Sequence, residues 1–324
     1  MAGSEMRGGR RAGVAATPGG QVALTVVARE RSLLQRVVRA RLYYLLLVPT
    51  FLLLLIFNYY PAFLAIYESV FKVDYGLSGV FIGLTNYVTL FQDPEFLATI
   101  PRVVQLTIFG VITAVTVPVI VAEWIFWLQS KRAQYFYRIL MIWPAIVPGV
   151  VTILIWQFIY DPYAGVLNSI LRAVGLSGLA QNWLGDPRIA LYSVMGSAFP
   201  FIGGVTVLIY LAGLQSISNE IFDAAAIDGA HGVRRFFTID LPLIMGQIKL
   251  NLVLAIIGGV QNFAGILILT NGGPAGATEV PGLYMYNVAF QYGKIGYASA
   301  IGVLIFLCIL VLTFLNMRYL RERV

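Results

Sequence analysis

Between two long apolar segments the chain reads Asp223-Ala-Ala-Ala-Ile-Asp-Gly-Ala-His-Gly-Val-Arg-Arg-Phe-Phe-Thr-Ile-Asp-Leu-Pro242. The alanines that follow the first acid remove side-chain bulk, so another surface can approach the backbone closely. Gly229 permits a turn that a residue with a Cβ atom resists, and Pro242 suits the first turn of a following helix. The stretch therefore predicts a helix, a turn and a second helix that a further protein surface can contact.

The composition of the chain is typical of a membrane protein with many spans. Of the 324 residues, 59% are hydrophobic and only 11% are charged, and the mean hydropathy is +0.82, far from the values of soluble domains. One span needs roughly 20 mostly apolar residues. We expect an all-α, polytopic transmembrane bundle of six spans, at about 43–60, 103–128, 137–160, 189–214, 243–270 and 296–317.

The distribution of positive charge predicts the orientation. Most of the 22 Lys and Arg residues fall in the N-terminal tail, between the second and third spans, in and just after the 223–242 stretch, and at the C-terminus. Positively charged connections remain cytoplasmic, so we expect both termini and this loop on the cytoplasmic side. The net charge of +7 then reflects topology, and a nucleic-acid partner is not expected.

The N-terminal residues 1–41 form a separate region, a cytoplasmic extension before a transmembrane domain at 42–324. Residues 1–20 are rich in Gly and Arg and predict disorder. Residues 22–41 have an apolar stripe opposite arginines, which predicts an amphipathic helix. Two placements are open for it, on the face of the bilayer or against the protein itself. A cleavable signal peptide is not expected.

The chain has no residues that suggest catalysis. Gly293-Lys294-Ile295 is the only Gly-Lys pair, and it lacks the glycine and hydroxyl positions of a phosphate-binding loop. His231 is the single histidine and Cys308 the single cysteine, which leaves no metal cluster and no catalytic triad. We expect no catalytic residue, metal ligand or cofactor in this chain, so a partner must supply the energy for any active transport.

The loop resembles the EAA loop of permease subunits in binding-protein-dependent ABC importers. Other stretches, in order, resemble the carbohydrate type of these permeases, which serves maltose and glycerol phosphate: Tyr59-Tyr60-Pro61, Gly83-Leu84-Thr85-Asn86-Tyr87, Phe91-Gln92-Asp93-Pro94-Glu95-Phe96, Trp143-Pro144, Asp161-Pro162 through Asn168, and Leu269 through Pro274. The resemblance covers roughly residues 43–320, which leaves only the N-terminal extension outside it.

The resemblance implies that the loop, residues 216–242, docks on a cytoplasmic ATPase. The residues expected to make or shape that contact are Asp223, Ala224, Ala225, Asp228, Gly229, Ile239, Leu241 and Pro242. Asp223 stands where the family has Glu, one methylene longer, and Glu220 is the alternative acid. Phe236 and Phe237 either contact the ATPase or pack on the spans, and packing is favoured.

A sugar path needs polar groups for hydroxyls and aromatic faces for stacking. Gln261, Asn262 and Phe263 in the fifth predicted span are the best such group, and Trp156 and Tyr210 are lesser candidates. The alternative role for the polar residues is hydrogen bonding between spans. Charge is nearly absent along this path, which favours a neutral saccharide.

Together these features predict the permease subunit of an ATP-driven ABC sugar importer in a bacterial or archaeal cytoplasmic membrane. The resemblance implies four kinds of partner: a second homologous permease, two ATP-binding subunits that hold ATP and Mg²⁺, an extracytoplasmic sugar-binding protein, and membrane lipid. The alternatives are a secondary transporter or channel, for which repeated halves are usual, and a non-transporting scaffold or enzyme.

Overall fold

The computed structural model describes residues 13–15, 23–25, 41–75 and 79–319. The chain divides into two units, Met1–Ala62 and Phe63–Val324. In the first unit, β1 (Gly13–Ala15) pairs with β2 (Ala23–Thr25) in antiparallel register, Gly13 opposite Thr25. Both predictions for the N-terminal extension need correction here, since 13–15 are ordered as a strand and 23–25 are not helical. Thr25 is β-branched, which favours an extended backbone. The rest of the predicted amphipathic helix, 26–40, lies outside the described residues.

The first predicted span is longer than expected. Arg41–Glu68 is one helical stretch of 28 residues, composed of α2 (Arg41–Leu54), the π-helical turn η1 (Leu55–Tyr59) and α3 (Tyr60–Glu68). The helix runs past the expected end at about residue 60 because the apolar sequence continues beyond it. The π-helical turn η1 lies just before Pro61 and accommodates the backbone N–H group that proline lacks.

The second unit is almost entirely helical. Its elements are β3 (Phe71–Lys72), β4 (Val80–Phe81), α4 (Thr85–Gln92), α5 (Pro94–Phe126), α6 (Lys131–Ile146), α7 (Gly149–Ile159), α8 (Val166–Ala173), η2 (Ser177–Leu179), α9 (Ala190–Gly196), α10 (Gly204–Gln215), α11 (Asn219–Ile227), α12 (Gly232–Arg235), η3 (Phe236–Asp240), α13 (Leu241–Leu243), α14 (Met245–Gln261), α15 (Ala264–Leu269), α16 (Pro281–Phe290) and α17 (Ile295–Tyr319). The two short strands β3 and β4 pair with each other.

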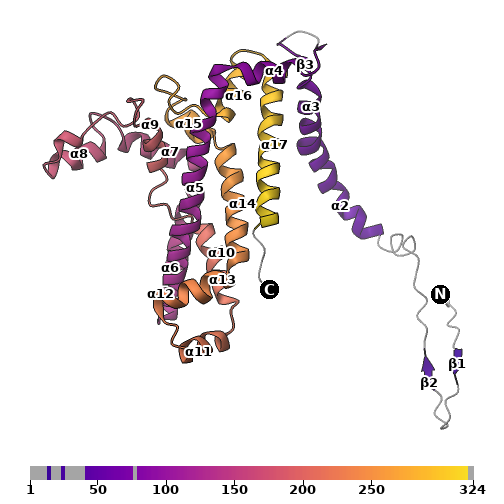
Figure 1. Cartoon of the computed structure of the whole chain (residues 1–324), viewed down its shortest axis with the longest axis vertical. Coiled ribbons are helices and arrows are strands. Elements are labelled where there is room, and N and C mark those ends of the chain that lie inside the picture. The colour runs from indigo at the N-terminus through magenta and orange to yellow at the C-terminus, as the bar shows by residue number, and fades with distance from the viewer. Residues whose placement is uncertain (1–12, 16–22, 26–40, 76–78, 320–324) are drawn as a thin grey trace, which may run out of the picture. The chain divides into compact units, whose positions relative to one another are not determined.

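Helix α5 lies at the centre of this unit. It packs along α14 and α10 and also contacts α6, while α17 packs against α14 and α16 (Figure 1). The largest core cluster joins α5, α10 and the start of α14 through Ala122, Ile125, Val207, Leu214 and Ile244, each fully buried. These side chains come from segments that are apolar on all faces, as expected for helices surrounded by lipid and protein.

Local sequence explains where α5 begins and ends. The carboxylate of Asp93 accepts hydrogen bonds from the backbone N–H groups of Glu95 and Phe96, and Pro94 occupies the first turn, a strong N-terminal signal. At the other end, the side-chain amide of Gln134 donates to the carbonyl oxygens of Phe126 and Leu128. These bonds satisfy carbonyl groups that a helix end leaves without partners.

The other predicted spans are only partly continuous. Among the described residues, three helical stretches are long and apolar enough to cross a membrane: Arg41–Glu68, Pro94–Phe126 and Ile295–Arg318. Three further pairs are bent, and the number of spans rises to six if each pair is one span. The bend between α6 and α7 is 86° and falls at Val147 and Pro148, because the residue before a proline avoids the helical conformation.

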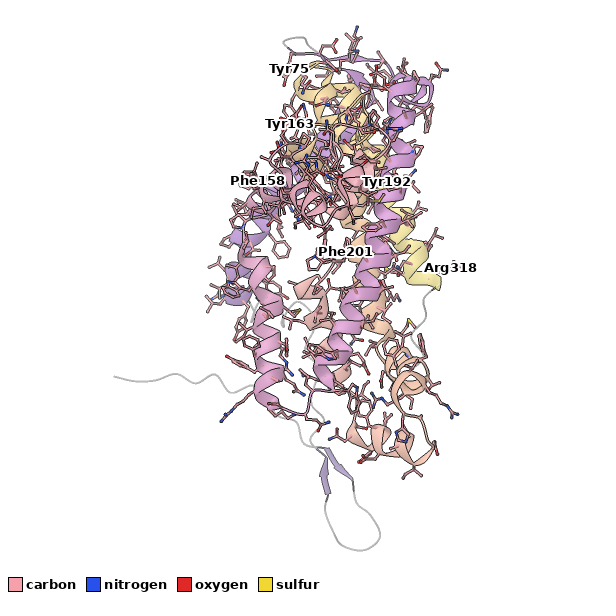
Figure 2. All side chains as sticks on the ribbon, turned by 90° about the vertical axis from the view of Figure 1, so that its left-hand side faces the viewer. Tyr75, Phe158, Tyr163, Tyr192, Phe201 and Arg318 are labelled. Carbon is pink, nitrogen blue, oxygen red and sulfur yellow. The ribbon has the colours of Figure 1, made fainter. Side chains whose placement is uncertain are left out.

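Two predicted spans are interrupted inside their expected limits. The span expected at 189–214 contains α9 and α10 separated by the non-helical residues 197–203, and the span expected at 243–270 breaks after Gln261. Phe201 in the first interruption has a φ of +62°, a conformation that an aromatic residue adopts only where its surroundings hold it. Its ring lies 5.5 Å from that of Phe109 on α5, and Figure 2 places it between the ends of the bundle.

Glycines allow the helices of this unit to approach closely. A Cβ atom on Gly204 would collide with the carbonyl oxygen of Met141 on α6, and one on Gly259 would lie 3.0 Å from the Cα atom of Thr107 on α5. Close helix crossings therefore occur at both glycines. Gly258 has no neighbour within 4 Å of such an atom, so only one glycine of that pair is needed for contact.

Candidate functional site

The predicted loop is a helix, a turn and a second helix at one end of the second unit. Helix α11 ends at Ile227, and residues 228–231 lead to α12, η3 and α13, which follow one another without a gap. Gly229 and Gly232 have φ angles of +72° and +52°, which glycine adopts without steric cost. Figure 1 shows α11 to α13 at the end of the bundle opposite α4 and α16.

The first half of the loop presents most of its predicted residues to solvent. Asp223, Ala224, Asp228 and Gly229 are exposed. Ala225 differs, because it is only 4% exposed and packs inside the chain. Of the two alanines expected to admit another surface, only Ala224 is therefore available in this structure. Glu220 and His231 are exposed as well.

The second half of the loop is divided between exposed and buried side chains. Pro242 is exposed in the first turn of α13, while Ile239 and Leu241 are half-buried. Phe236 packs against the large core cluster, as favoured from the sequence. Phe237 is 60% exposed and so leaves an aromatic surface beside the turn.

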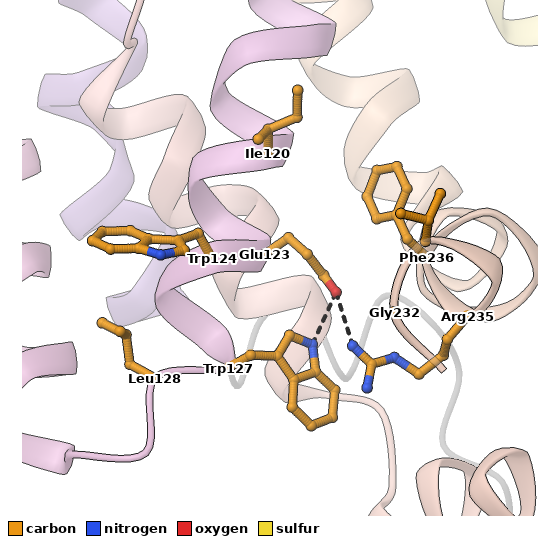
Figure 3. A pocket seen from close by; sticks show the side chains of 9 residues that line it. Ile120, Glu123, Trp124, Trp127, Leu128, Gly232, Arg235 and Phe236 are labelled. Carbon is orange, nitrogen blue, oxygen red and sulfur yellow. Dashed lines mark hydrogen bonds and ion pairs between the residues drawn. The ribbon is translucent and has the colours of Figure 1, made fainter. Parts of the chain in front are cut away.

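Arg235 holds the second half of the loop to α5. Its Nη2 atom donates to Oε1 of Glu123 at 3.2 Å, and its Nε atom donates to Oδ2 of Asp240 at 3.0 Å. The indole N–H of Trp127 donates to the same Glu123 oxygen at 2.8 Å, as Figure 3 shows. The three charged side chains are 17%, 17% and 0% exposed for Arg235, Glu123 and Asp240.

Aromatic rings complete this contact. The guanidinium carbon of Arg235 lies 3.6 Å from the ring centroid of Trp127 and 5.9 Å from that of Phe222 on α11. Arginine combines such stacking with in-plane hydrogen bonds. Removing one partner of a buried ion pair leaves an uncompensated charge and costs about 3–5 kcal/mol, so the contact fixes the position of α12 relative to α5.

Two cavities border the loop. A cleft of about 470 Å³ is lined by Ile120, Trp124, Val233, Arg235 and Phe236, among others, and Figure 3 looks into it. A more polar one of about 640 Å³ is lined by Asp223, Phe222, Lys131 and Arg138, among others. Exposed acid, exposed aromatic ring and neighbouring basic groups make this end of the bundle suited to contact a charged protein surface.

The sequence did not reveal the Arg235 contact. From the sequence alone, Arg235 is one of several basic residues that indicate topology. Glu123 is expected to snorkel or to pair with another charge near the end of a span. An acid inside an apolar helix was the available signal, since intramembrane charges pair with one another. Its partner, 112 residues away, has no signal in the linear pattern.

The candidate path residues fall into two places. Gln261 and Asn262 are exposed where α14 breaks, and the ring of Phe263 stacks on Tyr286 at 5.9 Å. After the break, α15 packs on α7, the helix that carries Trp156. The segment that directly follows the 261–263 group therefore lies beside the Trp156 helix.

Tyr210 lies apart from that group. It is fully buried in the core cluster, and its hydroxyl lies 3.4 Å from the carbonyl oxygen of Ala114 on α5. This placement gives Tyr210 a packing role in the present conformation. Among the described residues, no group of three or more His, Cys, Asp or Glu side chains is placed to hold a metal ion.

Known proteins similar to this chain are membrane components of transporters. The Bacillus subtilis protein named "Probable ABC transporter permease protein YurN" is 33% identical over 86% of this chain and 95% of that protein. The Brucella abortus protein named "sn-glycerol-3-phosphate transport system permease protein UgpA" is 34% identical over 87% of this chain and 95% of that protein. The Streptococcus mutans protein named "Multiple sugar-binding transport system permease protein MsmF" is 31% identical over 84% and 92%.

A solved structure has the same fold. It is a chain of "a bacterial ABC transporter involved in the import of the acidic polysaccharide alginate", with a TM-score of 0.79 and 24% identity, over 90% of this chain and 99% of that one. Residues 114–324 also match the family described as "Binding-protein-dependent transport system inner membrane component", and this segment includes the whole loop and all candidate path residues. The chain therefore belongs to the family of inner-membrane components of binding-protein-dependent transport systems.

Proposed function

We propose that this chain is the permease subunit of an ATP-driven sugar importer and forms half of its membrane path. The observation that carries the proposal is the loop 216–242, a polar helix–turn–helix at one end of an apolar bundle, with Asp223, Ala224 and Phe237 exposed. The name of one relative, a multiple sugar-binding transport system permease protein, supports the same substrate class.

The partners follow from this role. ATP, with Mg²⁺, is bound and hydrolysed by two cytoplasmic subunits that receive the loop, a second permease of similar design completes the path, and an extracytoplasmic binding protein delivers the sugar. Both termini and the loop face the cytoplasm. The loop transmits ATPase closure because it makes different contacts in the two states of the transporter. A neutral saccharide fits the uncharged 261–263 group.

The path runs through the interruption of α14. Unwound backbone at membrane depth occurs where it lines a cavity or is buried in protein. Gln261 and Asn262 offer amide groups to sugar hydroxyls there, and Phe263 and Trp156 offer aromatic faces.

The first test is co-purification from the native membrane of the wild type and of Gly229→Asp. We expect an ATPase and a second permease to accompany the wild type, and the ATPase to be lost from the variant. Gly175→Asp is the matched control, since Gly175 has a φ of +81° and open space around it but lies beyond α8, far along the chain from the loop.

The sugar is then identified with the same purified complex, by measuring ATP hydrolysis and uptake. The complex in proteoliposomes, with its binding protein, is offered a panel of saccharides, and the one that stimulates ATP hydrolysis and accumulates is the substrate. A wild-type chain that purifies alone and still moves solute along an ion gradient would show that it is a secondary transporter.

A further inference from the structure

We propose that Arg235 is a positioning residue that makes the second half of the loop, Gly232–Asp240, and the adjoining end of α5 move as one body. The inference rests on the proposed function and identifies the connection by which a displacement of the loop reaches the membrane helices. It concerns the cluster of Arg235, Glu123, Asp240 and Trp127, called here the Arg235 link.

The Arg235 link joins segments that are distant in the sequence. Glu123 and Trp127 belong to the last turn of α5 and the residue after it, and Arg235 and Asp240 belong to α12 and η3. The bond from Arg235 to Glu123 connects residues 112 positions apart, whereas the bond to Asp240 is local. The local bond therefore orients the guanidinium group, and the distant one attaches it to α5.

Geometry makes this attachment rigid. Two hydrogen bonds leave the guanidinium group through different nitrogen atoms, and Trp127 covers its face at 3.6 Å. A guanidinium group that is bound by two carboxylates and covered by one aromatic ring retains little rotational freedom. Because Asp240 is 0% exposed and the other two side chains are 17% exposed, water competes weakly for these bonds.

The neighbouring arginine provides a contrast. Arg234 is exposed, and it has no ion-pair partner in the part of the chain that the structure describes. The first half of the loop is also attached differently, since Phe222 of α11 meets the link only through its ring, 5.2 Å from Trp127. Charge alone therefore does not distinguish Arg235; its buried pairing does.

A distance measurement tests the common movement without knowledge of the sugar. Spin labels are placed on cysteines at Val233, which is 75% exposed, and at Gln129, which is exposed just beyond α5, in a Cys308→Ser background of the assembled transporter. We expect the distance between the labels to stay within about 2 Å between the nucleotide-free state and the state trapped with ATP and vanadate. With Arg235→Ala added, it should shift or broaden. A wild-type change well beyond that range, or an Arg235→Ala distribution identical to wild type, would overturn the proposal.

A second experiment separates transmission from assembly. Sugar uptake and ATP hydrolysis are measured together for Arg235→Lys, for Glu123→Gln and for the control Arg318→Lys, an exposed arginine outside the loop. Lysine keeps the positive charge but lacks the planar guanidinium group, so we expect sugar moved per ATP to fall about tenfold, while the ATPase still co-purifies. Glu123→Gln should act in the same direction, and Arg318→Lys should match wild type.

The outcomes distinguish this inference from the proposed function. If the wild-type complex neither binds an ATPase nor takes up any sugar, the proposed function fails. If the wild type transports and both Arg235→Lys and Glu123→Gln keep its ratio of sugar to ATP, the Arg235 link fails while the permease role stands. Should Arg235→Lys not assemble, the isosteric Glu123→Gln decides.

Discussion

Tyr297 donates a hydrogen bond of 2.7 Å to the carboxylate of Asp93, across 204 positions of the chain. Tyr284 donates to the same oxygen at 2.7 Å. Asp93 therefore caps α5 with one carboxylate oxygen, and its other oxygen accepts the hydrogen bonds from α16 and α17. At the end of the bundle opposite the loop, a single carboxylate sets the relative position of three helices.

Replacing Asp93 with asparagine should destabilise the protein by about 2 kcal/mol, because two bonds to a charged acceptor are weakened together. Thermal unfolding of the purified chain in detergent measures the change. Asp74→Asn is the control, since Asp74 lies 3.9 Å from Lys72 in a partly exposed pair, and ion pairs near the surface contribute little. Equal losses in the two variants would contradict the role given to Asp93.

The contribution of Asp93 should depend on pH. Burial acts to raise its pKa, but the hydrogen bonds from the two tyrosines and from two backbone N–H groups outweigh burial, and the pKa lies below the ordinary value of 3.8. A depressed pKa means that the stabilisation is complete above the unfolded value and disappears as pH falls through the folded one. The stability difference between wild type and Asp93→Asn should thus be constant from pH 7 to about pH 5 and shrink below about pH 4. A difference that grows on acidification would refute this assignment.

Two adjacent glycines of α14 should respond oppositely to alanine. Gly259→Ala forces a methyl group against Thr107, at 3.0 Å from its Cα atom, and should cost about 1–3 kcal/mol. Gly258→Ala has open space and should be neutral or slightly stabilising, since alanine favours helix. Unfolding of both variants by denaturant in detergent gives the comparison, and equal effects would show that the helix crossing is not tight there.

Asn168 should be essential for the loop that contains α8. It is 1% exposed, its amide donates to the carbonyl oxygens of Pro162 and Gln181, and its own oxygen accepts the indole N–H of Trp183 at 2.8 Å. Asn168→Asp removes both donors and should cost about 2–4 kcal/mol. A change in tryptophan fluorescence and faster proteolysis near residue 165 are the expected signs. The control Asn182→Asp alters an exposed side chain and should do neither.

Asn262→Ala tests the substrate path. We expect a higher concentration of sugar for half-maximal uptake, by about tenfold, because one hydrogen bond to a buried ligand is worth about 1–1.5 kcal/mol. Asn251→Ala within α14 is the comparison: Asn251 is 3% exposed, so its loss should lower stability instead. Unchanged uptake by Asn262→Ala would remove this residue from the path.

The long apolar segments were predictable because hydrophobic periodicity and length depend on local sequence alone. The interruptions were harder to locate. Pro148 signals the bend between α6 and α7, but the segment around Phe201 is stabilised by its contact with Phe109, a tertiary effect that no local pattern contains. Likewise, α14 ends at Gln261 without a proline, and the following α15 packs on α7, a tertiary contact that no local pattern contains.

In the loop, too, some features follow from local sequence and others depend on tertiary contacts. The turn at Gly229 follows from glycine itself, and its φ of +72° confirms it. The inward direction of Ala225 and the pairing of Arg235 with Glu123 depend on how α5 and the loop meet. At the N-terminus an apolar stripe predicts a helix, yet residues 23–25 pair with 13–15, because a stripe alone does not exclude an extended backbone.

The two attachments of α5 have a mechanical consequence. Its 33 residues span about 50 Å, with Asp93 bound to α16 and α17 at one end and Glu123 bound to Arg235 at the other. A rod fixed at one end tilts when the other is displaced, and a displacement of about 5 Å, one helical turn, corresponds to roughly 6° of rotation. The crossing of Thr107 and Gly259, near the middle, then moves about half as far. A displacement of the loop would therefore move the loop side of the bundle by its full amount, while the opposite side stays almost still.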